Sequence, residues 1–199
     1  MNNIIILGTS DLFEMTESSL DPKKFRISGY LAPQKNSHEA YRKYTYLGDD
    51  NILRSNSYRD HFFVVAIYDN KRREIICNIL ESHNRLLLNV VHPSSVVMPS
   101  VIIEKGTTVA FLCTISSFSH VGKCVVIRSH AHLAHDVSVG NYSFIGPGAC
   151  LLGGVQVGAG TLVGANATIF PNVKIGNKCI IGAGSILRHD VPSGTKFIS

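Results

Sequence analysis

His135 and Asp136 are the residues whose types and spacing best suit catalysis. A neutral imidazole near pH 7 is the usual general base, and it typically contributes about 10²–10⁴-fold to a rate. A nearby carboxylate can hold the imidazole in one tautomer and raise its basicity. Adjacency in the chain does not prove that the two side chains touch, so their contact is a prediction for the structure to test.

The segment around this pair follows a repeat of six residues. The seventeen positions from Val91 to Leu187 that are spaced six apart are all aliphatic, and glycine follows seven of them. Such a period is the signature of a hexapeptide solenoid, in which each hexad forms a short strand and a turn. Three hexads make one triangular coil, so residues 91–199 are predicted to form a parallel β-solenoid. Cys113 and Cys179 occupy an interior position of the hexad and are expected to pack in its core.

Four histidines lie within sixteen residues of this solenoid: His120, His130, His132 and His135. None falls on an interior position, which indicates either a partner surface or solvated turns. His130 and His135, five residues apart, have the spacing of two zinc ligands in the γ-class carbonic anhydrases. A zinc site needs a third ligand, and the corresponding faces two coils upstream carry serines. We therefore predict no metal site.

Residues 1–90 alternate strand-like and helix-like stretches. We expect strands at 3–7, 25–31, 61–67 and 86–91, and helices at 9–20 and 70–83. This order predicts a small α/β domain over residues 1–90, with a Rossmann-like parallel sheet about half the size of a dinucleotide-binding fold. The chain is thus expected to hold two domains, 1–90 and 91–199.

Ligands of parallel sheets bind beyond the carboxyl ends of the strands. That rule points to Gly8, Thr9, Ser10 and Gly48 as substrate-binding residues. As a phosphate cradle the first turn is weak, because it holds a single glycine and Asp11, the expected N-cap of the first helix, would repel an anion. An ordinary strand-to-helix turn is the alternative.

Composition excludes several classes of protein. Glycine is uneven, with three of the 17 before residue 91, and the net charge of +5 forms no basic cluster of the kind that binds nucleic acid. No apolar run approaches the ~20 residues that cross a bilayer, and the first eight residues lack a basic start and a cleavage site. Five cysteines without a CxxC pair predict reduced thiols and a cytoplasmic protein.

Two runs of the chain resemble a known family. Residues 92–109 (HPSSVVMPSVIIEKGTTV) and residues 133–192, from LAHDVSVGNYSF to ILRHDVP, resemble the left-handed β-helix acyltransferases of the sialic acid O-acetyltransferase and bacillosamine-type nucleotide-sugar N-acetyltransferase group. Leu47-Gly48-Asp49-Asp50 is similar to the small sugar-nucleotide domain of that group. The resemblance covers nearly the whole chain and implies an α/β domain followed by an all-β left-handed parallel β-helix.

The resemblance also implies chemistry. It implies a homotrimer with active sites between subunits, acetyl-CoA as co-substrate, and His135 as the base that deprotonates the acceptor, supported by Asp136. Acetyl-CoA would contact Phe144, Gly164, Ala165, Gly182 and Ala183. Phe144 stands where the family often has a second histidine that contacts the acetyl group, so carbonyl polarisation would fall to backbone N–H groups.

These expectations combine into one predicted function. The chain is expected to be an acetyl-CoA-dependent N-acetyltransferase of an amino sugar, nucleotide-linked, in bacterial surface glycan synthesis. Sialic acid-type O-acetylation is the alternative among acetyltransferases. A non-catalytic trimeric scaffold, favoured by Phe144 and the glycine-poor first turn, and a zinc hydratase are the alternatives from other classes.

Overall fold

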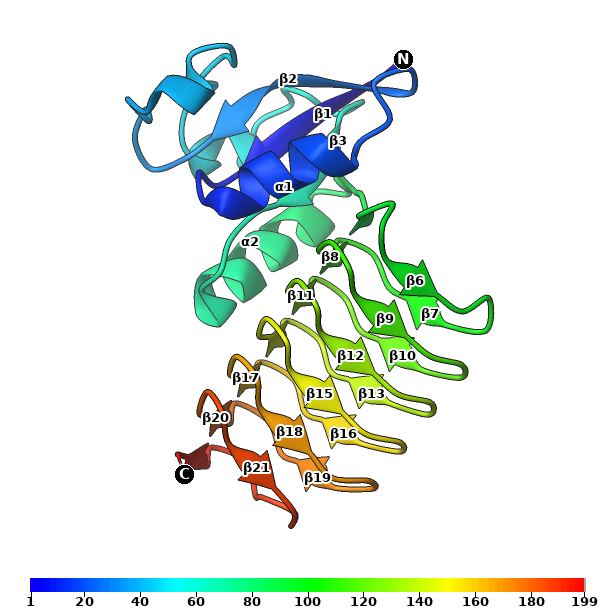
Figure 1. Cartoon of the computed structure of the whole chain (residues 1–199). Helices are drawn as coiled ribbons and strands as arrows, with labels where there is room; N and C mark the ends of the chain where they lie inside the picture. The colour runs from blue at the N-terminus through cyan, green and yellow to red at the C-terminus, as the bar shows by residue number, and fades with distance from the viewer. Residues whose placement is uncertain (199) are drawn as a thin grey trace.

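The computed structural model describes residues 1–198. A helix-covered sheet at the N-terminal end is followed by a ladder of short strands that reaches the C-terminal end (Figure 1). The N-terminal elements are β1 (Asn2–Leu7), α1 (Asp11–Ser19), β2 (Phe25–Leu31), the 3-10 helices η1 (Glu39–Tyr41) and η2 (Asp50–Arg54), β3 (Phe62–Val65), α2 (Asn70–Ser82) and β4 (Leu86–Leu87). The four strands pair in parallel in the order β2-β1-β3-β4.

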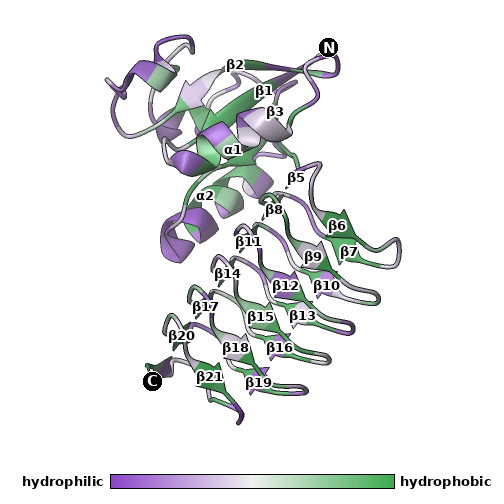
Figure 2. Cartoon of the chain, viewed as in Figure 1, coloured by the Kyte–Doolittle hydropathy of each residue, from purple (hydrophilic) through white to green (hydrophobic). Residues whose placement is uncertain are grey.

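The N-terminal sheet is buried on both faces. Residues 4–7 of β1 are four successive fully buried residues, the pattern of a parallel strand covered on both sides. Leu12 and Phe13 of α1 pack on one face, and Ile76 and Leu80 of α2 pack on the other. Figure 2 shows hydrophobic residues in β1 and on parts of both helices. The predicted small parallel α/β sheet is observed, and no helix within residues 1–198 is long and apolar enough to span a membrane.

One predicted strand is divided between the two parts of the chain. The sequence predicts a single strand at 86–91, but β4 pairs with β3 whereas β5 (Val90–Val91) pairs with β8 (Thr108–Val109). The side chain of Asn89 lies at the break. It donates to the Ile103 carbonyl at 3.2 Å and accepts from the Thr107 amide at 3.1 Å. These bonds attach the connection to the solenoid, so the chain leaves one sheet and enters the next within three residues.

The solenoid has three faces, each a parallel sheet of two-residue strands. Face 1 holds β5, β8, β11 (Val126–Ile127), β14 (Phe144–Ile145), β17 (Leu162–Val163), β20 (Ile180–Ile181) and β22 (Lys196–Phe197). Face 2 holds β6 (Val96–Val97), β9 (Thr114–Ile115), β12 (His132–Leu133), β15 (Cys150–Leu151), β18 (Thr168–Ile169) and β21 (Ile186–Leu187). Face 3 holds β7 (Ile102–Ile103), β10 (His120–Val121), β13 (Ser138–Val139), β16 (Gln156–Val157) and β19 (Lys174–Ile175).

The register of these sheets agrees with the hexad. Ile127 pairs with Ile145, 18 positions further on, so three hexads complete one coil. The aliphatic second residue of most strands is buried in one continuous core, and Cys113 and Cys179 are 1% exposed within it, as predicted. This parallel β-solenoid fits the left-handed β-helix that the family resemblance implies. We call the turns between faces the 1–2, 2–3 and 3–1 corners.

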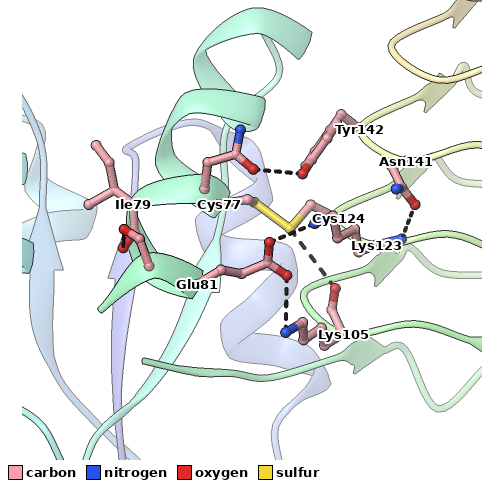
Figure 3. A network of polar contacts seen from close by, with 10 residues as sticks. Cys77, Ile79, Glu81, Lys105, Lys123, Cys124, Asn141 and Tyr142 are labelled. Atoms are coloured by element: carbon pink, nitrogen blue, oxygen red, sulfur yellow. Dashed lines mark hydrogen bonds and ion pairs between the residues drawn. A yellow bond between two sulfur atoms is a disulfide. The ribbon is translucent and has the colours of Figure 1, made fainter. Parts of the chain in front are cut away.

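Helix α2 docks on the 3–1 corner (Figure 3). Glu81 forms ion pairs with Lys105 at 3.0 Å and Lys123 at 2.6 Å, two residues stacked one coil apart. One turn earlier on the helix, a disulfide joins Cys77 to Cys124. The prediction of reduced thiols is therefore wrong for this pair, because the docking of α2 brings together two fully buried cysteines that are 47 residues apart.

A fully buried arginine joins the same helix to the solenoid. Arg73 is 0% exposed, and all three of its guanidinium nitrogens donate hydrogen bonds. The acceptors are the carbonyls of Ile67, Tyr68, Cys124, Tyr142 and Ser143 and the Asn70 side chain, at 2.6–3.0 Å. Burial lowers the pKa of Arg73 to about 10, against the opposing effect of Asp69. The guanidinium thus holds the loop after β3 against two coils of the solenoid.

Candidate active site

The predicted His135–Asp136 contact is present. His135 lies on the 2–3 corner between β12 and β13, and its Nδ1 is 2.8 Å from Asp136 Oδ2. Asp136 has φ +60°, in the left-handed region that Asp tolerates better than most residues. If Nδ1 carries the proton toward the carboxylate, Nε2 is left with its lone pair free to accept a proton. Both side chains are exposed, at 69% and 59%, so the pair is open to a substrate.

The pair borders a shallow groove of about 350 Å³. The groove is lined by His135, Asp136, Gly153, Gly154, Pro171 and Asn172. These residues come from three successive coils of the 2–3 corner, since 135, 153 and 171 are spaced 18 apart. The repeat therefore places the groove along the corner turns that follow His135 in the stack.

Gly153 is a site residue that sequence reasoning missed. A Cβ built on Gly153 would lie 2.7 Å from both Cε1 and Nε2 of His135, far inside van der Waals contact. The imidazole thus rests on the bare backbone of the next coil. The signal that could have found it is the Gly153-Gly154 doublet, which begins 18 residues after His135.

Gly153→Ala is expected to displace the imidazole and lower kcat by about 10-fold to 100-fold, because a misplacement of about 1 Å can cost 10²-fold. The KM for acetyl-CoA, the co-substrate that the family resemblance implies, should stay within about twofold. Gly194→Ala is the control, since Gly194 has φ +79° and open space around its Cβ, so it introduces backbone strain without touching His135. Steady-state kinetics and thermal melting of both variants test the prediction, and an unchanged kcat in Gly153→Ala would contradict it.

A second His–Asp pair on the same corner is built differently. His189 lies three coils beyond His135 in the same stack, and Asp190 follows it. Asp190 Oδ1 accepts a hydrogen bond from the Lys174 amide at 2.7 Å. Within residues 1–198 no hydrogen bond joins Asp190 to His189. The same dipeptide thus forms a hydrogen-bonded His–Asp pair at one coil, whereas at another coil its aspartate binds a backbone amide of the neighbouring coil.

The residues predicted to bind acetyl-CoA lie elsewhere on the solenoid. Gly164-Ala165 and Gly182-Ala183 stack directly on the 1–2 corner, where a Cβ on Gly164 would lie 2.5 Å from the Ala183 nitrogen. Phe144 points outward from face 1, and its ring packs edge-on against Tyr68 with centroids 5.8 Å apart. Within one chain the structure therefore does not bring these residues to His135. Phe144 follows His135 by nine positions, half of an 18-residue coil.

The N-terminal candidates lie at the carboxyl ends of strands. Gly8 has φ +107°, and a Cβ there would lie 2.3 Å from the Ala66 carbonyl oxygen, so only glycine allows β1 and β3 to end so close together. Gly48 also has a positive φ, +113°, but a Cβ there would meet no atom within 4 Å. Its carbonyl accepts a hydrogen bond from the Ala32 amide at 3.1 Å. A cleft of about 330 Å³ opens beside this edge, lined by Pro33, Asp49, Asp50, Asn51, Arg54, Arg72, Ile75 and Ile79.

The turn before α1 differs from the prediction in its cap. Ser10, not Asp11, is the N-cap, and its Oγ accepts from the Leu12 amide at 3.3 Å. Asp11 is thereby free to point away from the helix, and its Oδ2 accepts from Arg128 Nη2 at 2.8 Å. Thr9 lies between these residues and the Gly8 turn. Side chains thus hold the first turn, and the exposed Asp11 carboxylate lies beside the helix N-terminus.

The four histidines that lie within sixteen residues of the solenoid occupy different corners and faces. Within residues 1–198 no three His, Cys, Asp or Glu side chains gather as a metal site would require. His130 lies on the 1–2 corner against Phe111, with ring centroids 6.1 Å apart, and His120 Nε2 pairs with Glu104 at 2.9 Å. His132 points outward from face 2.

The repeat of this three-faced solenoid matches the repeat of a known family of transferases. Residues 118–153, 136–171 and 154–189 match the family model "Bacterial transferase hexapeptide (six repeats)". The predicted resemblance to nucleotide-sugar N-acetyltransferases of this repeat class is confirmed by the relatives that follow.

A GDP-perosamine N-acetyltransferase of Escherichia coli is 30% identical over 99 residues, a match that spans 50% of this chain and 45% of that protein. A mutant of perosamine N-acetyltransferase from Caulobacter crescentus, solved in complex with CoA and GDP-perosamine, superposes with a TM-score of 0.89 and 28% identity, covering 98% of this chain and 92% of that one. The acetyltransferase domain of PglB from Neisseria gonorrhoeae, in complex with acetyl coenzyme A, shares the fold with a TM-score of 0.89 and 22% identity, over 97% of this chain and 94% of that one.

Proposed function

We propose that this chain transfers the acetyl group of acetyl-CoA to the amino group of a nucleotide-linked amino sugar. The observation that carries the proposal is the hydrogen-bonded, exposed His135–Asp136 pair. It lies in a chain that superposes over 98% of its length on a perosamine N-acetyltransferase solved with CoA and GDP-perosamine. Residues 1–90 would hold the sugar nucleotide, and residues 91–199 would bind acetyl-CoA and carry the base. We place the reaction in the cytoplasm.

The mechanism follows from the orientation of the imidazole. As the acceptor nitrogen attacks the thioester carbonyl, His135 Nε2 takes the proton from that nitrogen. A C–N bond forms, the C–S bond breaks, and the CoA thiolate leaves and accepts a proton from the imidazolium. Asp136, 2.8 Å from Nδ1, stabilises the imidazolium between these two transfers. No covalent enzyme intermediate is needed, because the acceptor attacks the thioester directly.

The arrangement of the solenoid supports a site shared between copies of the chain. His135 lies on the 2–3 corner and Gly164, Ala165, Gly182 and Ala183 on the 1–2 corner, so one chain cannot present both sets to one substrate. A second copy set with its 1–2 corner against the 2–3 corner of the first would unite them. Repeated three times, this heterologous contact closes into a ring, which is the homotrimer we propose.

Phe144 has a different place in this proposal. Its ring packs against Tyr68 of the same chain on face 1, where it supports the N-terminal sheet. It has no hydrogen-bond donor to offer an acetyl carbonyl. Polarisation of that carbonyl would therefore come from backbone N–H groups at the stacked corners.

The test is an acetyl-transfer assay with the full chain. Purified protein, acetyl-CoA and GDP- or UDP-linked 4-amino sugars are incubated, and free CoA thiol and product mass are followed. Transfer to the amine, with loss of turnover when the acceptor is the matching hydroxyl sugar, supports the proposal. Transfer to a hydroxyl only, or no transfer to any of these acceptors, would overturn it.

A further inference from the structure

Arg128 joins the solenoid to the N-terminal sheet, but its contacts differ from those of the buried Arg73. It follows β11 on the 1–2 corner, and its Nη2 donates to Asp11 Oδ2 at 2.8 Å. Its guanidinium lies over the ring of Tyr68, 4.9 Å from the centroid, and the Tyr68 hydroxyl donates to the same carboxylate. The three side chains form a cluster that we call the junction cluster: Asp11, Tyr68 and Arg128.

The carboxylate of the junction cluster is charged at neutral pH. Partial burial raises the pKa of Asp11, but the hydrogen bonds from Tyr68 and Arg128 outweigh it and hold that pKa below its ordinary value. Desolvation and the bond to Asp11 raise the pKa of Tyr68, which remains a neutral donor. One negative and one positive charge therefore face each other in the cluster.

The guanidinium of Arg128 keeps unused donors. Its side chain is 17% exposed, yet within residues 1–198 only Nη2 has an acceptor, so Nε and Nη1 are unpaired. Arg73, by contrast, donates from all three nitrogens to protein acceptors. The Tyr68 ring and the Asp11 carboxylate hold this guanidinium in one orientation. Its free N–H groups can then donate two parallel hydrogen bonds to another oxyanion, such as a phosphate.

The position of the junction cluster is where the two proposed substrates would meet. Asp11 and Tyr68 follow the carboxyl ends of β1 and β3, the edge at which parallel sheets bind ligands. Arg128 also belongs to a column of residues that each follow a face 1 strand: His92, Ala110, Arg128, Gly146, Gly164 and Gly182. The lower part of this column is the predicted path of acetyl-CoA. Its upper end faces the sheet that would hold the sugar nucleotide.

We propose that Arg128 binds a phosphate oxygen of the nucleotide-linked acceptor, with Asp11 and Tyr68 orienting its guanidinium for that contact. The inference rests on the proposed function for the identity of the acceptor. It makes Arg128 a specificity-determining residue, because it selects a phosphorylated sugar over a free one. Asp11 keeps the guanidinium in place through Nη2, and the phosphate oxygen would bind at Nε and Nη1, the nitrogens that do not contact this carboxylate.

Calorimetric binding to the full chain tests this assignment without requiring catalysis. The probes are GDP, UDP, guanosine, uridine and CoA, titrated into the unmodified chain and the variants Arg128→Gln, Arg128→Lys and Arg26→Gln. The unmodified chain should bind one nucleoside diphosphate more tightly than its nucleoside. Arg128→Gln should weaken that diphosphate by about 10-fold to 100-fold, the range of a charge-assisted hydrogen bond, and leave the nucleoside and CoA within about twofold.

The variants separate binding from folding. Arg128→Lys keeps the charge without the fork and should fall between the unmodified chain and Arg128→Gln. It also serves as the test variant if Arg128→Gln fails to fold. Arg26 is exposed at the start of β2, the opposite edge of the same sheet, so Arg26→Gln removes the same charge and should bind the diphosphate as the unmodified chain does.

Three results would overturn the assignment: equal diphosphate affinity in Arg128→Gln and the unmodified chain, an equal loss for diphosphate and nucleoside, or a loss for CoA in place of the diphosphate. Failure of the proposed function is separately visible. A chain that binds a nucleoside diphosphate through Arg128 but transfers no acetyl group would overturn only the enzyme assignment. A chain that acetylates a sugar amine but binds no diphosphate would overturn only the role of Arg128.

Discussion

Replacing His135 with alanine is expected to lower kcat for acetyl transfer by about 100-fold to 10,000-fold, the range that a positioned general base contributes. The imidazole is exposed and does not belong to the hydrophobic core, so the free energy of unfolding should change by less than about 0.5 kcal/mol. Steady-state kinetics over a range of pH, with the thermal melting temperature measured beside it, check the prediction.

His189→Ala is the matched control for this experiment. His189 lies in the same stack on the 2–3 corner and is also followed by an aspartate, but that aspartate caps the Lys174 amide. The His189→Ala variant should therefore keep the kcat of the unmodified chain. Asp136→Asn should fall between the two, because Asn can still accept from Nδ1 but carries no charge to stabilise the imidazolium. Equal turnover in His135→Ala and His189→Ala would refute the assignment of the base.

Replacing Arg73 with methionine is expected to lower the free energy of unfolding by about 3–5 kcal/mol. Six charge-assisted hydrogen bonds, each worth about 1.5–3 kcal/mol, link Arg73 to the loop after β3 and to the solenoid. They outweigh the several kcal/mol that removing a guanidinium from water costs. Methionine fills much of the volume but leaves buried carbonyls without donors. Urea unfolding followed by circular dichroism measures the change.

Arg72→Met provides the comparison at the adjacent position. The Arg72 side chain is 43% exposed and forms an ion pair with Asp50, so its removal should cost less than about 1 kcal/mol. If Arg73→Met is no less stable than Arg72→Met, the buried guanidinium does not contribute what its contacts indicate. A loss confined to the N-terminal sheet, with the solenoid intact at the same urea concentration, would still agree with the prediction, since Arg73 joins the two.

The hexad made the solenoid predictable from the sequence. Aliphatic residues of the repeat pair with residues 18 positions away, as Ile127 does with Ile145, so the information is local and recurs at seventeen positions. The interior places of Cys113 and Cys179, and the stacking of Gly164 on Ala183, follow from that period. The parallel N-terminal sheet was predictable for a similar reason, because unbroken apolar runs indicate strands that are buried on both faces.

The contacts between the two parts of the chain were not predictable in this way. Cys77 and Cys124 are 47 residues apart, Arg73 reaches Ser143 across 70, and Asp11 reaches Arg128 across 117. No local pattern records such pairs, because each is used once and depends on how α2 and the N-terminal sheet dock on the solenoid. The prediction of reduced thiols failed here for that reason.

The sequence by itself determined the repeat, the inward residues of the solenoid and the His–Asp dipeptide that carries the proposed chemistry. Only the tertiary structure decided which of the two His–Asp dipeptides is an oriented pair, and it placed Gly153 under the imidazole of His135. It also set His135 and Phe144 apart around the coil. The physical reason is that the position of a residue in the hexad determines only whether its side chain points into the solenoid or away from it. The contacts that make a site depend on the residues of the neighbouring coil and of the docked helix.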